Sequence, residues 1–146
     1  MMTRNTGRRL IWHGVFLFLL GLLTGFVIPA ITNPRLGLSA HMEALLNGMF
    51  LILVGGIIWN ELKLSDRIAN AAFWLLLCAA YGSWVSCLLA AVFGASKMLP
   101  IASAGYTAVA WQETLVRIGL SIVAISITLA TCLILYGFRK SAVETA

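Results

Sequence analysis

Three polar residues stand close together at the start of an otherwise apolar segment. The stretch LSAHMEALLNG, residues 38–48, contains His41, Glu43 and Asn47, and nearly every residue from there to Trp59 is apolar. An imidazole can ligate haem iron, a carboxylate can move a proton, and an amide can orient a substrate. A buried amide without a partner costs about a few kcal/mol, so Asn47 is expected to face a partner, a cavity or a cofactor.

Each of these residues also has a purely structural explanation. His41 could hydrogen-bond to lipid headgroups or to a backbone carbonyl. Glu43 could stabilise the positive N-terminal end of its helix, and Asn47 could hydrogen-bond to a second helix. On a helix, Glu43 and Asn47 share a face because they are four residues apart, and His41 lies about 120° around from Asn47. Their presence together weakens the purely structural explanation and leaves a shared site open beside it.

The remaining residues limit the chemistry of such a site. The sequence has two histidines and three cysteines, with no CxxC, no zinc-ligand spacing, no glycine-rich phosphate loop and no nucleophile elbow. The cysteines fall within apolar segments and are expected to be small filler; they are Cys78, Cys87 and Cys132. A haem needs only one protein ligand, and His41 could supply it.

The second histidine, His13, is expected at the opposite membrane face, where its ring would snorkel to the interface. It would then lie about a membrane thickness from His41, so the two could not ligate one iron within a chain. A bis-histidine electron-transfer haem is therefore not expected. An iron held by His41 would keep one axial position open, and an open ferric site can act as a Lewis acid.

The composition indicates how these residues are positioned. The chain has 146 residues, of which 61% are hydrophobic and 10% charged, far from the balance of a soluble domain. Apolar stretches at residues 10–31, 41–59, 68–93 and 114–138 are each long enough to cross a bilayer. The sequence therefore predicts an all-α membrane protein, a single domain over residues 1–146 built as a four-helix bundle. Ser39 is expected to cap the second helix, and Glu113 to pair with Arg117.

The distribution of basic residues predicts the orientation. Excess Lys and Arg mark cytoplasmic segments, which places both termini and the 60–67 link in the cytoplasm. The cytoplasmic set is Arg4, Arg8, Arg9, Lys63, Arg67, Arg139 and Lys140, and the opposite set is Arg35, Lys97 and Arg117. The basic residues form no stripe, so no nucleic-acid partner is expected. Small residues along the helices favour close packing and an oligomer whose order the sequence leaves open.

The residues from 33 to 55, NPRLGLSAHMEALLNGMFLILVG, strongly resemble the hydroxylaminobenzene mutases. Through His-x5-Asn-Gly-Met they also resemble the related styrene oxide isomerases. The likeness extends to HGVFLFLLGLLTGF at residues 13–26 and covers most of the chain. The resemblance implies a small membrane isomerase, a homotrimer with haem b between subunits. It also implies that His41 ligates the iron and that Asn47 assists on the distal side.

The sequence departs from the epoxide isomerases at two positions on the third helix. If Trp84 is aligned with the family tryptophan, Ala90 replaces a tyrosine and Ser86 replaces an asparagine. The missing tyrosine counts against styrene oxide as substrate, and Tyr81 is the nearest candidate to replace its hydroxyl. A glutamate at the position of Glu43 resembles the mutase branch of the family and not the epoxide branch.

The sequence thus predicts an isomerase that converts hydroxylaminobenzene, an aryl hydroxylamine, to 2-aminophenol in a bacterial inner membrane. Ferric haem b on His41 would polarise the oxygen, Asn47 would orient this small aromatic substrate, and Glu43 or Tyr81 would move the ring proton. One alternative is the rearrangement of an epoxide to an aldehyde by the same machinery. Another is a small multidrug exporter, although such pumps need a carboxylate in the first helix and residues 10–31 contain none.

Overall fold

A computed structural model describes residues 2–103 and 105–144, with side chains described for residues 5–103 and 105–139. All regular structure in these ranges is helical. In chain order the elements are α1 (Met2–Val27), η1 (Ile28–Ala30), α2 (Pro34–Leu53), η2 (Val54–Ile58), η3 (Trp59–Glu61), α3 (Asp66–Phe93), α4 (Pro100–Ser103) and α5 (Ala110–Glu144). The η2 segment is a π-helical turn, and it continues α2 toward the η3 turn.

Four helical segments are long and apolar enough to cross a membrane, which confirms the predicted all-α architecture. They are Asn5–Ala30, Pro34–Glu61, Asp66–Phe93 and Ala110–Arg139, with mean hydropathies of 2.2, 1.8, 2.0 and 2.5. The first, third and fourth lie close to the predicted spans. The second begins at Pro34 and not at His41, so the predicted start was wrong.

The early start of α2 has a local cause in Asn33. Its side-chain oxygen accepts hydrogen bonds from the backbone N–H groups of Arg35 and Leu36, at 3.1 and 3.3 Å. Pro34 follows at the first helical position, where its missing N–H costs nothing. Ser39 is therefore not the cap as predicted, and its hydroxyl donates back to the carbonyl of Arg35 within the helix.

Asn33 also joins the loops at this end of the bundle. It is fully buried, and its amide group donates to the carbonyl of Ser103 at 2.8 Å. Its backbone N–H donates to the carbonyl of Ala91 near the end of α3. That helix stops at Gly94, whose φ of 70° is left-handed and suits glycine.

The predicted ion pair between Glu113 and Arg117 does not describe what Glu113 does. Its carboxylate is buried and accepts backbone hydrogen bonds from Ser96 and Lys97, at 2.9 and 3.1 Å. The Ser96 hydroxyl donates to it as well. Glu113 thus ties the loop after α3 to the first turn of α5.

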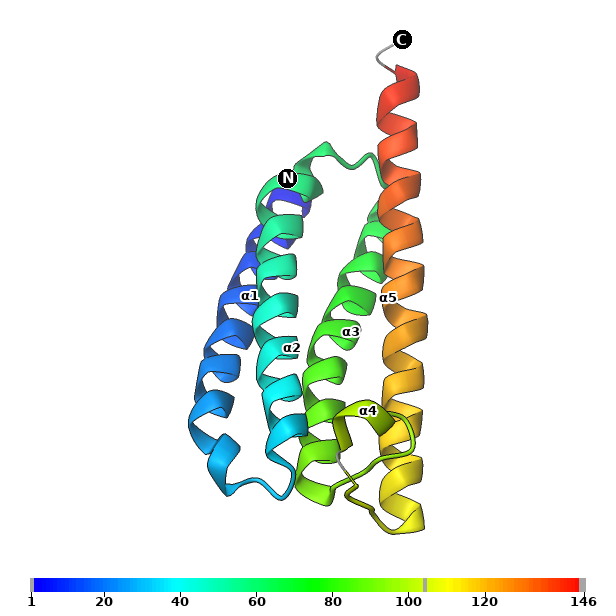
Figure 1. Cartoon of the computed structure of the whole chain (residues 1–146). Coiled ribbons are helices and arrows are strands. Elements are labelled where there is room, and N and C mark those ends of the chain that lie inside the picture. The colour runs from blue at the N-terminus through cyan, green and yellow to red at the C-terminus, as the bar shows by residue number, and fades with distance from the viewer. Residues whose placement is uncertain (1, 104, 145–146) are drawn as a thin grey trace.

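The helices follow one another across the bundle in chain order. Among the described helices, α1 packs along α2, α2 along α3 and α3 along α5, and the only other helical element that α5 contacts is η3. Figure 1 shows that both ends of the described chain lie at the same end of the bundle as the link between η3 and α3. This matches the predicted grouping of the termini with that link, while the side chains of Arg4 and Lys140 lie outside the described ones.

Glycines spaced by seven residues set the packing of α1 against α2. Gly7 faces Gly55, and Gly14 faces Gly48. A Cβ added at Gly14 would lie 2.6 Å from the carbonyl oxygen of Gly48, so the two backbones are in direct contact. Close backbone approach through small residues is how helices associate in lipid, where apolar burial between them gains little.

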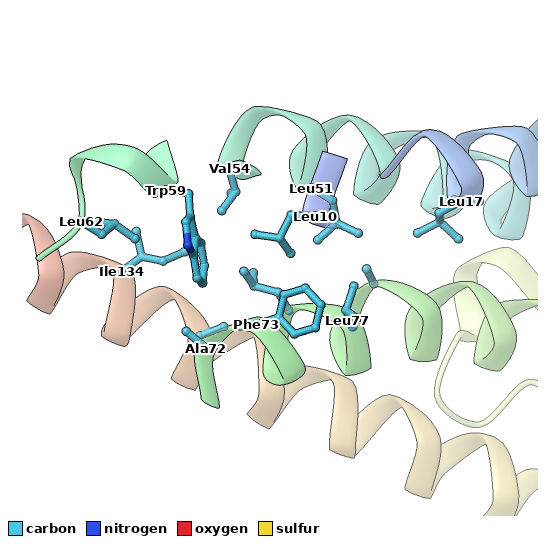
Figure 2. Close-up of a cluster of buried hydrophobic side chains, with 14 residues drawn as sticks. Leu10, Leu17, Leu51, Val54, Trp59, Leu62, Ala72, Phe73, Leu77 and Ile134 are labelled. Atoms are coloured by element: carbon cyan, nitrogen blue, oxygen red, sulfur yellow. The ribbon is translucent and has the colours of Figure 1, made fainter. Parts of the chain in front are cut away.

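The main apolar core lies toward the end of the bundle that carries the termini. Figure 2 shows Leu10 and Leu17 of α1 and Leu51 of α2 converging on Phe73 and Leu77 of α3. Trp59 and Ile134 close the cluster toward the η3 turn. This core fixes α3 against the α1–α2 pair and so places the polar residues of α3 relative to α2.

The contact between α1 and α2 can be tested with Gly48→Ala. The new methyl would lie 2.8 Å from the backbone oxygen of Gly14, and backbone cannot yield as a side chain can. We expect a loss of stability of about 1–3 kcal/mol, the usual cost of overpacking, measured as reduced thermal stability in detergent. Gly56→Ala is the matched control, because its methyl would meet only Ile11 at 3.8 Å. Equal stability of the two variants would contradict this account.

Candidate functional site

His41 occupies the third position of the glycine contact between α1 and α2. It follows Gly55 and Gly48 at the same seven-residue interval, and it faces Gly21 of α1. Its Nδ1 lies 2.7 Å from the carbonyl oxygen of Gly21 and must donate a hydrogen there, since a carbonyl can only accept. The ring also packs on Gly25, where an added Cβ would lie 3.1 Å from Nδ1.

This contact determines which nitrogen of a neutral His41 ring carries the hydrogen. With the hydrogen on Nδ1, the neutral imidazole has its lone pair on Nε2. A carbonyl bound to the far nitrogen is the usual support of a metal-ligating histidine, because it fixes both the tautomer and the ring orientation. The His41 side chain as a whole is half-buried.

Glu43 and Asn47 lie on the other side of α2, against α3. The amide nitrogen of Asn47 donates to Oε2 of Glu43 at 3.0 Å, as their spacing predicts. The hydroxyl of Ser83, on α3, donates to the same oxygen at 2.6 Å. Glu43 and Asn47 are half-buried, and Ser83 is buried.

The hydrogen bonds leave one acceptor open on each of these two side chains. Both donors bind Oε2 of Glu43, and within the described part of the chain Oε1 accepts no hydrogen bond. Asn47 must turn its NH₂ group to the carboxylate, so its carbonyl oxygen points elsewhere. Within the described part of the chain, Oε1 of Glu43 and the amide oxygen of Asn47 therefore have no hydrogen-bond donor.

Tyr81 is not brought to this cluster. Its hydroxyl lies 3.1 Å from Nδ1 of His13 and donates to the backbone oxygen of His13 at 3.3 Å. His13 does not snorkel as predicted, because its ring is held by Tyr81 and lies edge-on to Trp12 and Phe73. Tyr81 therefore connects α1 to α3 in this structure.

The separation of the two histidines is smaller than predicted. His13 adjoins Gly14, which faces Gly48, whereas His41 faces Gly21. The eight residues from His13 to Gly21 correspond to about 12 Å along α1, and not to a membrane thickness. The rings still point in different directions, His13 toward α3 and His41 toward α1.

The two positions that depart from the epoxide isomerases lie away from the α2 cluster. Ala90 is fully buried in a small apolar cluster near the end of α3. Ser86 is buried against Gly119 of α5. Trp84 instead reaches α1, where its indole N–H donates to the Thr24 hydroxyl at 3.0 Å.

Ser83 is the residue of this cluster that sequence reasoning did not assign to it. Serine is a small residue, and the sequence predicts only close helix packing for the small residues of the third span. Its buried hydroxyl could have been a signal, because polar groups inside a membrane need partners. The pairing with Glu43 depends on how α2 and α3 align, and the sequence does not give that alignment.

Fold and site together define a multi-pass membrane protein with a carboxylate, an amide and an imidazole inside its helical spans. The family model for styrene oxide isomerase matches residues 6–139. The chain therefore belongs to the styrene oxide isomerase family.

Two relatives from Ectopseudomonas oleovorans are similar over most of the chain. Hydroxylaminobenzene mutase HabB is 44% identical over 135 residues, which cover 92% of this chain and 82% of the relative. Hydroxylaminobenzene mutase HabA is 40% identical over 104 residues, which cover 70% of this chain and 76% of the relative. No solved structure matches the chain.

Proposed function

We propose that this protein is a membrane isomerase that rearranges hydroxylaminobenzene to 2-aminophenol. Its family and the names of its two relatives support an intramolecular rearrangement of this substrate. The observation that carries the proposal is the pair formed by Glu43 and Asn47, which offers two open acceptor atoms inside an apolar bundle. The substrate is a small aromatic molecule that partitions into membranes, which suits a site within the helical spans.

The contacts of His41 support a haem b at this histidine. The bond from Nδ1 to Gly21 occupies that nitrogen, so the neutral imidazole would present the lone pair of Nε2 to an iron. A ferric haem bound there would supply a Lewis acid that weakens the N–O bond of the substrate. Among the described residues no group of three or more His, Cys, Asp and Glu side chains could hold a metal ion by itself, so a cofactor with one protein ligand suits this chain better.

The arrangement of His41 and Asn47 on α2 supports a site completed by a neighbouring subunit. His41 faces α1, whereas Glu43 and Asn47 face α3. Two residues that point to different sides of one helix can serve one site when a second copy contributes one of them. We therefore propose a homotrimer in which His41 of one chain and Asn47 of its neighbour approach the same substrate.

The rearrangement moves an oxygen and one proton without any net oxidation. The N–O bond breaks, the oxygen forms a bond to the ortho carbon, that carbon loses its hydrogen as a proton, and the nitrogen gains one. The amide oxygen of Asn47 can accept a hydrogen bond from the substrate N–H, which orients the ring. Oε1 of Glu43 can take the ring proton and return it to nitrogen. The apolar surroundings keep water from the cationic ring.

We place the protein in a bacterial inner membrane with both termini in the cytoplasm. The basic residues support this orientation, and both ends of the described chain lie at one end of the bundle (Figure 1). The exporter alternative is not favoured, because the family and the absence of a carboxylate from residues 10–31 both count against it. Epoxide isomerisation is not favoured either, since Ala90 offers no hydroxyl.

The haem assignment can be tested by visible spectroscopy of the protein purified in detergent. We expect a Soret band in the wild-type protein and its loss in His41→Ala, because that variant lacks the axial nitrogen. His13→Ala is the matched control and should keep the band, since the His13 ring is bound to Tyr81. A colourless preparation that is fully active would refute haem-assisted chemistry.

The substrate assignment can be tested by supplying hydroxylaminobenzene and styrene oxide in parallel. We expect 2-aminophenol from the first, with oxygen-18 in the hydroxylamine group retained in the product and none gained from labelled water. Glu43→Gln should lower kcat about a hundredfold, a typical contribution of a general base. Glu61→Gln, at the exposed end of the same span, should leave kcat unchanged. Phenylacetaldehyde from styrene oxide, with no aminophenol, would select the epoxide alternative.

A further inference from the structure

We infer that Ser83 is a positioning residue, which holds Glu43 so that Oε1 is the atom that receives the proton from the ortho carbon. This inference rests on the proposed function and adds a residue to it. It starts from the 2.6 Å bond between the Ser83 hydroxyl and Oε2 of Glu43, which joins α3 to α2 within the bundle.

The geometry gives the two carboxylate oxygens different roles. Oε2 accepts hydrogen bonds from Ser83 and Asn47, and these donors stabilise the negative charge on that oxygen. Oε1 accepts none within the described chain, so its lone pairs are the ones open to an incoming proton. The three side chains come from two helices, so they fix the direction of the carboxylate as well as its charge.

Asn47 alone could not hold Glu43 in this way. The two residues belong to the same helix, so the bond between them does not set the position of the carboxylate relative to α3. Ser83 is buried on α3, which the main core fixes against α1 and α2. The bond to the Ser83 hydroxyl therefore fixes the Glu43 carboxylate relative to a helix other than its own.

The need for an oriented base distinguishes this rearrangement from the isomerisation of an epoxide. When the oxygen joins the ortho carbon, that carbon still bears its hydrogen, and the ring becomes aromatic only after the proton has left. The electron pair of the C–H bond returns to the ring, the proton goes to Oε1, and it then passes to nitrogen. An epoxide that opens and undergoes a hydride shift needs no such base.

The test compares Ser83→Ala, Ser83→Thr and Ser126→Ala as full-length proteins. Ser83→Ala removes the donor, Ser83→Thr retains a hydroxyl, and Ser126 is a buried serine of α5 whose hydroxyl contacts Cys78 and not Glu43. Each is assayed with hydroxylaminobenzene and with the substrate deuterated at both ortho carbons. The infrared carboxylate band of Glu43, identified by its absence in Glu43→Gln, is recorded for each without substrate.

We expect Ser83→Ala to lower kcat about tenfold with little change in KM, because the lost bond to a charged group acts on the base and not on substrate binding. The isotope effect on kcat should rise above the wild-type value, since proton removal has become slower. The Glu43 band should shift, and Ser83→Thr should restore all three quantities. Ser126→Ala should match the wild type.

The experiment distinguishes failure of the Ser83 inference from failure of the proposed function. If Ser83→Ala keeps the wild-type isotope effect and infrared band, the inference is wrong while the proposed function stands. The same holds if kcat falls equally in Ser83→Ala and Ser126→Ala, which would indicate a general structural effect. If the wild-type protein produces no aminophenol, the proposed function fails together with the proton transfer, and the infrared band still reports whether Ser83 binds Glu43.

Discussion

The backbone contact between α1 and α2 is the constraint on which the polar site depends. Gly7 and Gly14 meet Gly55 and Gly48 so closely that neither helix can slide or rotate without a clash. The same seven-residue interval brings His41 to Gly21, where a carbonyl and not a side chain holds the ring. The orientation of the imidazole is thus a consequence of helix packing.

The sequence predicted the helical content and the shared face of Glu43 and Asn47 more reliably than the contacts between helices. Long apolar stretches identify spans because lipid leaves the backbone few alternatives to a helix. The start of α2 was misplaced, since Asn33 combines a cap with two tertiary hydrogen bonds that a local pattern cannot reveal. The partners of Tyr81 and Ser83 depend on the alignment of different helices, and no alignment follows from a single amphipathic pattern.

The polar cluster also shows how a carboxylate is accommodated within the bundle. Among the described residues, the hydrogen-bond partners of Glu43 are neutral groups, the Ser83 hydroxyl and the Asn47 amide. Both of these donors bind Oε2, so no described donor occupies Oε1. A structural carboxylate would be expected to have both oxygens bound, as Glu113 does.

The difference between Glu43 and Glu113 bears on how a site can be recognised in such a protein. Glu113 receives backbone hydrogen bonds on both of its oxygens, is buried at 4% exposure, and closes a loop at the end of the bundle. Glu43 lies within a span, is half-buried, and has its bonds on one oxygen only. If carboxylates were ranked as candidate site residues by burial alone, Glu113 would come before Glu43. The unsatisfied acceptor ranks Glu43 first, because a proton or a substrate can bind only where the protein leaves an atom free.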